Sequence, residues 1–132
     1  NVEQLSELLP PQRVLPALAI RDEADAAWAD EFLSNHTAIL ADAFSPTAHG
    51  GTGKVFDHRF VQPYFARTRV LIAGGLNPEN IEEILFRLTP GGLPYAFDLS
   101  SGIEESPGVK SERKMRRFFE EFHRALGGSS QP

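Results

Sequence analysis

Four short apolar runs, rich in small and β-branched residues, recur along the chain and are typical of buried strands in a parallel sheet. They are Arg13–Ile20, Ala38–Phe44, Arg69–Gly75 and Tyr95–Gly102. The first run is the weakest candidate, because Pro16 cannot donate a hydrogen bond to a neighbouring strand. Segments of a different periodicity separate the runs, so we expect helices between the strands.

Segments with helical periodicity lie before, between and after these runs. They are Val2–Leu9, Glu23–Leu33, His58–Ala66, Pro78–Leu88 and Glu112–Leu126. The apolar residues of the last segment predict one buried face that consists of Met115, Phe118, Phe119, Phe122 and Leu126. Its basic residues fall largely on the other side, as on a solvated helix face. Residues 127–132 are rich in glycine and serine and predict a helix stop with a disordered tail.

The order of these segments is one helix followed by four strand–helix units. Such alternation predicts an α/β protein whose parallel strands are joined by right-handed crossovers. A doubly wound sheet and a (β/α)8 barrel both fit the pattern, and four units would make half of a barrel. In either architecture, functional groups gather at the C-terminal ends of the strands.

Composition narrows the choice of partners. The chain of 132 residues suffices for one modest domain, and its formal net charge of −5 argues against a general nucleic-acid or membrane binder. No apolar run approaches a membrane span and no signal peptide is visible, which together with the absence of cysteine favours a cytoplasmic protein. The four histidines share no metal-ligand spacing, so no metal site is predicted. Because the chain begins at Asn1 inside a helix-like pattern, we expect it to be a piece of a longer protein.

The stretch His49–Asp57, "HGGTGKVFD", is superficially like the phosphate loop of a nucleotide-binding enzyme. That loop requires a glycine, four residues, then Gly-Lys and a residue with a hydroxyl group. Measured from Gly53 and Lys54, the first glycine position is Ala48 and the hydroxyl position is Val55. The motif fails at both positions, and an ATP- or GTP-binding role is rejected.

The third apolar run ends in "AGGLNPEN", which has the features of an anion-binding turn. Gly74 and Gly75 allow a ligand to approach the backbone closely. Asn77 is a good N-cap residue and Pro78 suits the first helical position, and the N–H groups at a helix start favour anions. A plain turn between a strand and a helix would use the same residues.

The fourth run ends with Ser100, Ser101 and Gly102, which offer hydroxyl and backbone N–H groups. The turns after the last two strands thus both have features that favour anion binding. This arrangement matches the phosphate sites that many barrels form after strands seven and eight. Phosphate is therefore the predicted ligand of these turns.

Two aspartates occupy the ends of predicted strands. Asp42 interrupts the apolar run "ILADAF", where a carboxylate is costly unless it is paired or faces a polar cleft. Such a group is suited to general-acid catalysis, although a structural carboxylate bonded to loop N–H groups fits the same position. Asp98 has a similar strand-end position and the same two interpretations.

Three motifs, "ILADAF…GGTGKVFD", "AGGLNPENIEEI" and "FDLSSGIEESPGVKSERKMRRFF", closely resemble the phosphoribosylanthranilate isomerase family, whose members are (β/α)8 TIM-barrel enzymes of tryptophan biosynthesis. The resemblance extends from about Val2 to Leu126. It implies that the four strands are numbers five to eight of the barrel. Residues 1–126 would then be the C-terminal portion of one barrel domain, from helix four to helix eight.

The resemblance implies an Amadori rearrangement of N-(5-phosphoribosyl)anthranilate to 1-(o-carboxyphenylamino)-1-deoxyribulose 5-phosphate, without a metal or a cofactor. Asp42 matches the family's general acid, which acts on the oxygen of the sugar ring, and Asp98 matches an aspartate near the anthranilate amino group. The family's glycine loop beside the substrate corresponds to Gly50, Gly51 and Gly53. Its phosphate-binding turns correspond to Gly74, Gly75, Ser100, Ser101 and Gly102.

One part of the family's machinery has no counterpart here. The general base of the family is a cysteine on strand one, and this chain has no cysteine. We therefore expect either a catalytic C-terminal portion that needs the N-terminal portion of the barrel, or a non-catalytic half-barrel that binds phosphate or assembles with itself. Open sheet edges and an uncovered inner face would favour association in both cases.

Overall fold

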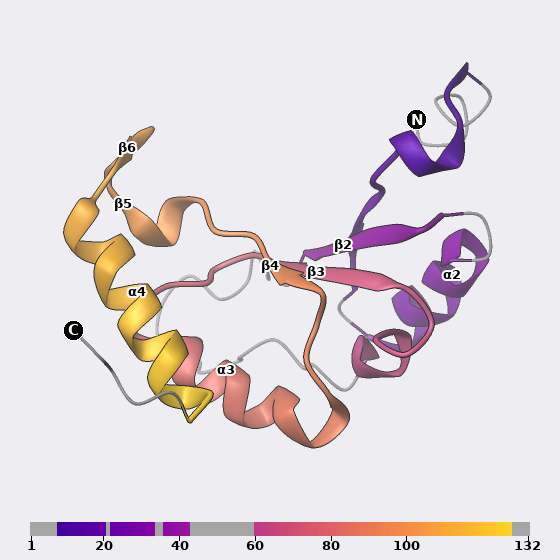
Figure 1. Cartoon of the computed structure of the whole chain (residues 1–132). Helices are drawn as coiled ribbons and strands as arrows, with labels where there is room; N and C mark the ends of the chain where they lie inside the picture. Colours follow the sequence, from indigo (N-terminus) through magenta and orange to yellow (C-terminus); the bar gives the residue numbers. More distant parts are fainter. Residues whose placement is uncertain (1–7, 21, 34–35, 43–59, 128–132) are drawn as a thin grey trace. The chain divides into compact units, whose positions relative to one another are not determined.

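The computed structural model describes four stretches of the chain, residues 8–20, 22–33, 36–42 and 60–127 (Figure 1). The chain divides into two compact units. One unit comprises Asn1–Ala73 and Pro94–Phe97, and the other comprises Gly74–Leu93 and Asp98–Pro132.

The first unit is built on a parallel sheet of four strands in the order β1-β2-β3-β4. The strands are β1 (Ala17–Ala19), β2 (Ala38–Asp42), β3 (Arg69–Ala73) and β4 (Ala96–Phe97). Each strand lies beside the one that precedes it in the chain, with no reversal of order among the described strands. A doubly wound sheet reverses its order at a switch point, so the observed order is consistent with a barrel-type α/β sheet.

The two faces of this sheet differ in burial. In β2 the side chains of Ile39 and Ala41 are fully buried, whereas Leu40 and Asp42 are half-buried. The register pairs Leu40 with Leu71 of β3. Since alternate residues of a strand point to opposite faces, Leu40, Leu71 and Asp42 share the less buried face. This face is the one that a closed barrel would turn inward.

Helix α2 (Glu23–Leu33) covers the same residues as its prediction. Asp22 caps it, because the Asp25 N–H donates to the Asp22 carboxylate at 2.9 Å. A short 3₁₀ helix, η4 (Gln62–Tyr64), precedes β3, and its Tyr64 hydroxyl donates to the Ala26 carbonyl at 2.5 Å. This bond fastens η4 to α2 within the first unit.

The second unit contains helices α3 (Ile81–Leu88) and α4 (Glu112–Ala125), which pack against each other (Figure 1). Arg124 of α4 pairs with Glu82 of α3 at 3.2 Å, and Arg117 of α4 pairs with Glu79, in the turn before α3, at 3.0 Å. A 3₁₀ helix, η6 (Ser101–Ile103), leads into a hairpin of β5 (Glu104–Ser106) and β6 (Val109–Lys110), which continues directly into α4.

The predicted strands are present but shorter than expected. The fourth ends at Phe97, and the last two residues of its predicted length, Ser101 and Gly102, belong to the 3₁₀ helix η6. Within the described part of the predicted helix His58–Ala66, the helical residues are Phe60 and η4, all of them 3₁₀-helical, and none is α-helical. The predicted helix Val2–Leu9 lies almost wholly outside the described residues, as do residues 128–132 of the predicted tail.

The predicted apolar face of α4 was wrong about Phe119 and Leu126. Phe118 is buried and stacks on Phe122 with ring centroids 6.2 Å apart, whereas Phe119 is 57% exposed and Leu126, which follows the last residue of the helix, is 44% exposed. Residues four apart share a helix face, but the next residue is turned by about 100°. Phe119 therefore lies beyond the edge of the stripe that Phe118 and Phe122 define.

Among the described residues, no helix has both the length and the apolarity needed to cross a membrane.

Candidate active site

The position of Asp42 is set by strand β2, of which it is the last residue. Its neighbours across the sheet are Ala73, the last residue of β3, and Ala19, the last residue of β1. The alternation of β2 puts Asp42 on the less buried face, with Leu40. A half-buried carboxylate at the C-terminal end of a parallel strand can reach a ligand bound at that end of the sheet, and can deliver a proton to it.

The turn after β3 is formed by two glycines and held by two asparagines. Gly74 and Gly75 have positive φ angles of 87° and 67°, which residues with a Cβ rarely adopt. The side-chain amides of Asn77 and Asn80 both donate to the Gly75 carbonyl, at 3.0 and 2.8 Å. The turn is therefore fixed from two sides.

Asn77 also begins the helical turn that precedes α3. Its Oδ1 accepts from the Glu79 N–H at 2.9 Å, and its carbonyl accepts from the Ile81 N–H at 3.2 Å. The expected cap is thus present, with Pro78 as the first residue of the turn, although the regular helix begins only at Ile81. Because the Asn77 N–H bonds to Asn80 Oδ1 at 2.9 Å, an anion here would be bound by the glycine N–H groups that precede it.

The turn after β4 lies directly against the first turn. A Cβ built on Gly102 would come within 1.8 Å of the Leu76 carbonyl oxygen and 2.9 Å of the Asn77 Cβ. Only a residue without a side chain fits at this contact. The structure therefore brings together the two turns that the sequence predicts as halves of one anion site, and Gly102 is the residue that allows it.

We expect Gly102→Ala to separate the two turns. The added methyl group cannot be accommodated by a side-chain movement, because the nearest atom is a backbone oxygen, so the turns must shift apart. The thermal midpoint should fall, by the equivalent of about 1–3 kcal/mol. Amide resonances of Leu76 and Asn77 should move more than those of α4. A variant with unchanged stability and unchanged Leu76 and Asn77 resonances would contradict the close contact.

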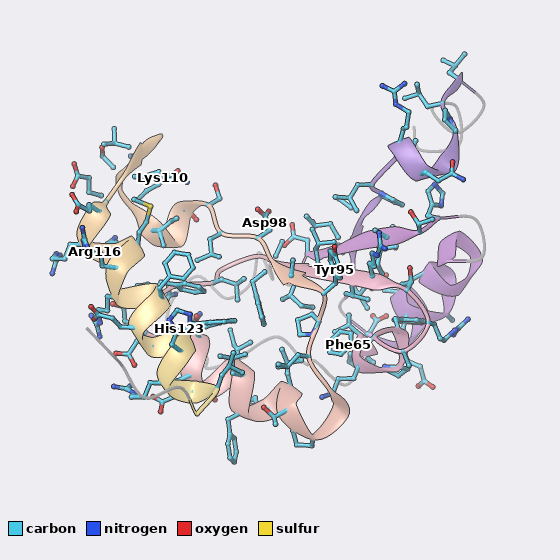
Figure 2. All side chains as sticks on the ribbon, in the orientation of Figure 1. Phe65, Tyr95, Asp98, Lys110, Arg116 and His123 are labelled. Carbon is cyan, nitrogen blue, oxygen red and sulfur yellow. The ribbon has the colours of Figure 1, made fainter. Side chains whose placement is uncertain are left out.

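The remaining predicted residues are placed as follows. Asp98 is exposed and follows β4 directly, as predicted (Figure 2). It belongs to the second unit with both turns, whereas Asp42 belongs to the first unit. The predicted substrate loop, Gly50, Gly51 and Gly53, lies outside the described residues.

Sequence reasoning missed two residues that hold these turns. Asn80 follows Asn77 by three residues, and this spacing places both side chains on the same side of the first helical turn. The spacing can be read from the sequence. Lys110 donates from Nζ to the Ser100 carbonyl at 2.9 Å. No local pattern predicts this bond, because the β5–β6 hairpin creates it.

The fold and these strand ends define an α/β protein with a carboxylate at the end of one parallel strand and glycine-containing turns after the next two. Comparison with known families identifies it further. The family of N-(5'-phosphoribosyl)anthranilate isomerases matches residues 2–121, and the chain belongs to this family.

Individual relatives agree with this assignment. The chain is 41% identical over 111 residues to the N-(5'-phosphoribosyl)anthranilate isomerase of Geobacter sp. strain M21, a match that covers 83% of this chain and 51% of the relative. The crystal structure of the isomerase from Thermotoga maritima aligns with a TM-score of 0.66 and 32% identity, over 91% of this chain and 54% of that one. The chain thus spans about half the length of the curated relatives that it matches.

A further structural neighbour, 28% identical with a TM-score of 0.62, is the isomerase in complex with reduced 1-(o-carboxyphenylamino)-1-deoxyribulose 5-phosphate. The alignment covers 95% of this chain and 53% of that one.

Proposed function

We propose that this chain supplies the proton donor and the phosphate cradle of a phosphoribosylanthranilate isomerase, as the C-terminal half of a (β/α)8 TIM barrel. The observation that carries the proposal is the contact of Gly102 with Leu76 and Asn77, which joins the turns after two neighbouring strands. Family membership supplies the substrate class, since the family is described as N-(5'-phosphoribosyl)anthranilate isomerase. The chain would act in tryptophan biosynthesis in the cytoplasm.

The phosphate of the substrate would be bound by backbone N–H groups. Those of Gly74 and Gly75 precede the asparagine-held turn, and those of Ser100, Ser101 and Gly102 lie in the turn packed against it. Oriented backbone dipoles at a helix start attract an anion without adding a movable charge. The phosphate would thereby fix one end of the substrate.

The reaction begins at the other end of the sugar. Asp42 would donate a proton to the oxygen of the furanose ring as the C1–O bond breaks, and the nitrogen lone pair would form the C1=N bond of an iminium ion. Removal of the C2 proton then gives an enolamine, which tautomerises to the ketone. Asp98 would lie near the anthranilate amine, with Gly50, Gly51 and Gly53 beside the substrate.

The base that removes the C2 proton would come from outside this chain. The family resemblance assigns that role to a cysteine, and the sequence contains none. An N-terminal half of the barrel would supply it, and would also cover the sheet face that carries Leu40 and Leu71. A second copy of this chain is the other partner that could cover that face.

The phosphate cradle can be tested with inorganic phosphate and amide NMR. In the wild-type chain, phosphate should shift the amide resonances of the two turns. In Gly75→Val the affinity for phosphate should fall about tenfold or more, because a branched side chain at φ 67° is strained and distorts the N–H donors. Ser101→Ala is the matched control and should stay within about twofold, because its N–H survives. The proposed site would be refuted if phosphate shifted only amide resonances on the basic side of α4 and Gly75→Val bound phosphate as tightly as the wild-type chain.

A further inference from the structure

The β5–β6 hairpin contributes one cationic side chain to the second anion turn. This residue is Lys110, on β6 (Figure 2). Its Nζ donates to the Ser100 carbonyl at 2.9 Å and to the Glu104 carboxylate at 2.8 Å. The same carbonyl also accepts the longer 3.3 Å bond from the Ile103 N–H that closes η6. The lysine therefore makes the shorter of the two bonds that hold this peptide group.

Holding the Ser100 carbonyl also orients the next N–H group. The Ser100–Ser101 peptide is planar and trans, so its C=O and N–H point in opposite directions. With the carbonyl directed at Lys110, the Ser101 N–H must point away from the hairpin. Ser101 is one of the residues proposed to bind phosphate, so its direction decides whether that donor is available.

Lys110 is in turn held in place by its own hairpin. The Glu104 side chain, only 16% exposed, accepts from Lys110, and the Lys110 and Gly108 hydrogen bonds lower the pKa of its carboxyl group. The turn between the strands is Pro107-Gly108, which brings β6 back alongside β5. Lys114 adds a bond from its Nζ to the Glu104 carbonyl at 2.6 Å. The Lys110 amine is therefore held in place by its hydrogen bonds, although 41% of the Lys110 side chain is exposed.

We propose that Lys110 is a positioning residue of the phosphate cradle: it fixes the Ser100–Ser101 peptide so that the Ser101 N–H is directed at the ligand, and Glu104 holds the lysine in place. The inference rests on the proposed phosphate site. It assigns to the β5–β6 hairpin the function of orienting one hydrogen-bond donor of that site, the Ser101 N–H group. The alternative is that Lys110 acts only as a nearby positive charge.

Two variants distinguish orientation from charge, with inorganic phosphate as the probe and amide NMR as the readout. Lys110→Met should weaken phosphate binding about three- to tenfold. It should also diminish the shift of the Ser101 amide proton at saturation, while the Gly75 response persists. Glu104→Gln keeps the lysine but loosens it, and removes a negative charge from the neighbourhood. A charge effect predicts tighter phosphate binding in Glu104→Gln, whereas positioning predicts weaker binding with a diminished Ser101 response.

Arg113→Met is the matched control, because it removes an exposed positive charge of α4 in the same unit. It should leave the affinity within about twofold and the Ser101 response intact. Wild-type affinity and Ser101 response in Lys110→Met, or tighter binding in Glu104→Gln, would overturn the inference while leaving the phosphate site standing. Should Lys110→Met unfold the hairpin, Glu104→Gln decides alone. A wild-type chain without phosphate shifts at either turn would instead overturn the proposed site, and this inference with it.

Discussion

Replacing Asp42 by Asn should abolish most of the isomerase activity of the complete enzyme. The amide has nearly the shape of the carboxylic acid but cannot deliver a proton to the ring oxygen. Loss of a general acid costs about 10²- to 10⁴-fold in rate. The effect should appear in kcat, with a small change in KM, because the phosphate turns are untouched. Steady-state kinetics with N-(5-phosphoribosyl)anthranilate measure both constants.

The matched control for this variant is Asp22→Asn. Asp22 caps α2 through its carboxylate, and asparagine caps a helix about as well as aspartate. This second Asp-to-Asn change in the same unit should leave kcat within about twofold. Near-wild-type turnover in Asp42→Asn would refute the general-acid role. Equal losses in both variants would mean that the damage is to folding rather than to chemistry.

The sequence predicted those parts of the fold that local signals control. The run Arg69–Gly75 is bounded by polar residues and glycines, and β3 occupies its first five residues, Arg69–Ala73. Helix α2 begins at the predicted residue, Glu23, because Asp22 caps its start. The turn at Gly74 and Gly75 was also predictable, because glycine and the Asn-Pro pair signal a strand end followed by a helix start.

Features that depend on contacts distant in sequence were not predictable. The contact of Gly102 with the Leu76 carbonyl requires the turns after two strands to meet. The bond from Lys110 to Ser100 spans ten residues through a hairpin. The sequence did hold a sign of that hairpin, since Pro107-Gly108 is a strong turn signal, but the flanking strands are too short to show an alternating pattern.

The chain Asn1–Pro132 by itself should not turn over phosphoribosylanthranilate, and adding an N-terminal half of the barrel should restore activity. Two features support this expectation. The sequence lacks the cysteine that the resemblance assigns as the base, and general-base help is worth about 10²- to 10⁴-fold in rate. The sheet face that carries Asp42 also carries the half-buried Leu40 and Leu71. Apolar residues of this kind are expected on a surface that further barrel strands cover.

Exposure of that face has a cost that association would relieve. Apolar surface left in water forfeits roughly 25 cal/mol per Å², so a few hundred Å² amounts to several kcal/mol, against a total domain stability of about 5–15 kcal/mol. The isolated chain should therefore self-associate, and light scattering against concentration measures this. An N-terminal half should convert the assemblies into a defined complex with isomerase activity.

A pair of variants tests whether the sheet face drives this association. Leu71→Asp places a charge on the face that carries Asp42, and should abolish both self-association and rescue by the N-terminal half, because an unpaired charge is costly to bury. Phe86→Asp changes an 80% exposed side chain of α3 and should leave rescue unaffected. Circular dichroism must show that both variants remain folded. A dilute monomer of the wild-type chain that isomerises the substrate unaided would refute the need for a second half, and another residue of this chain would then have to act as the base.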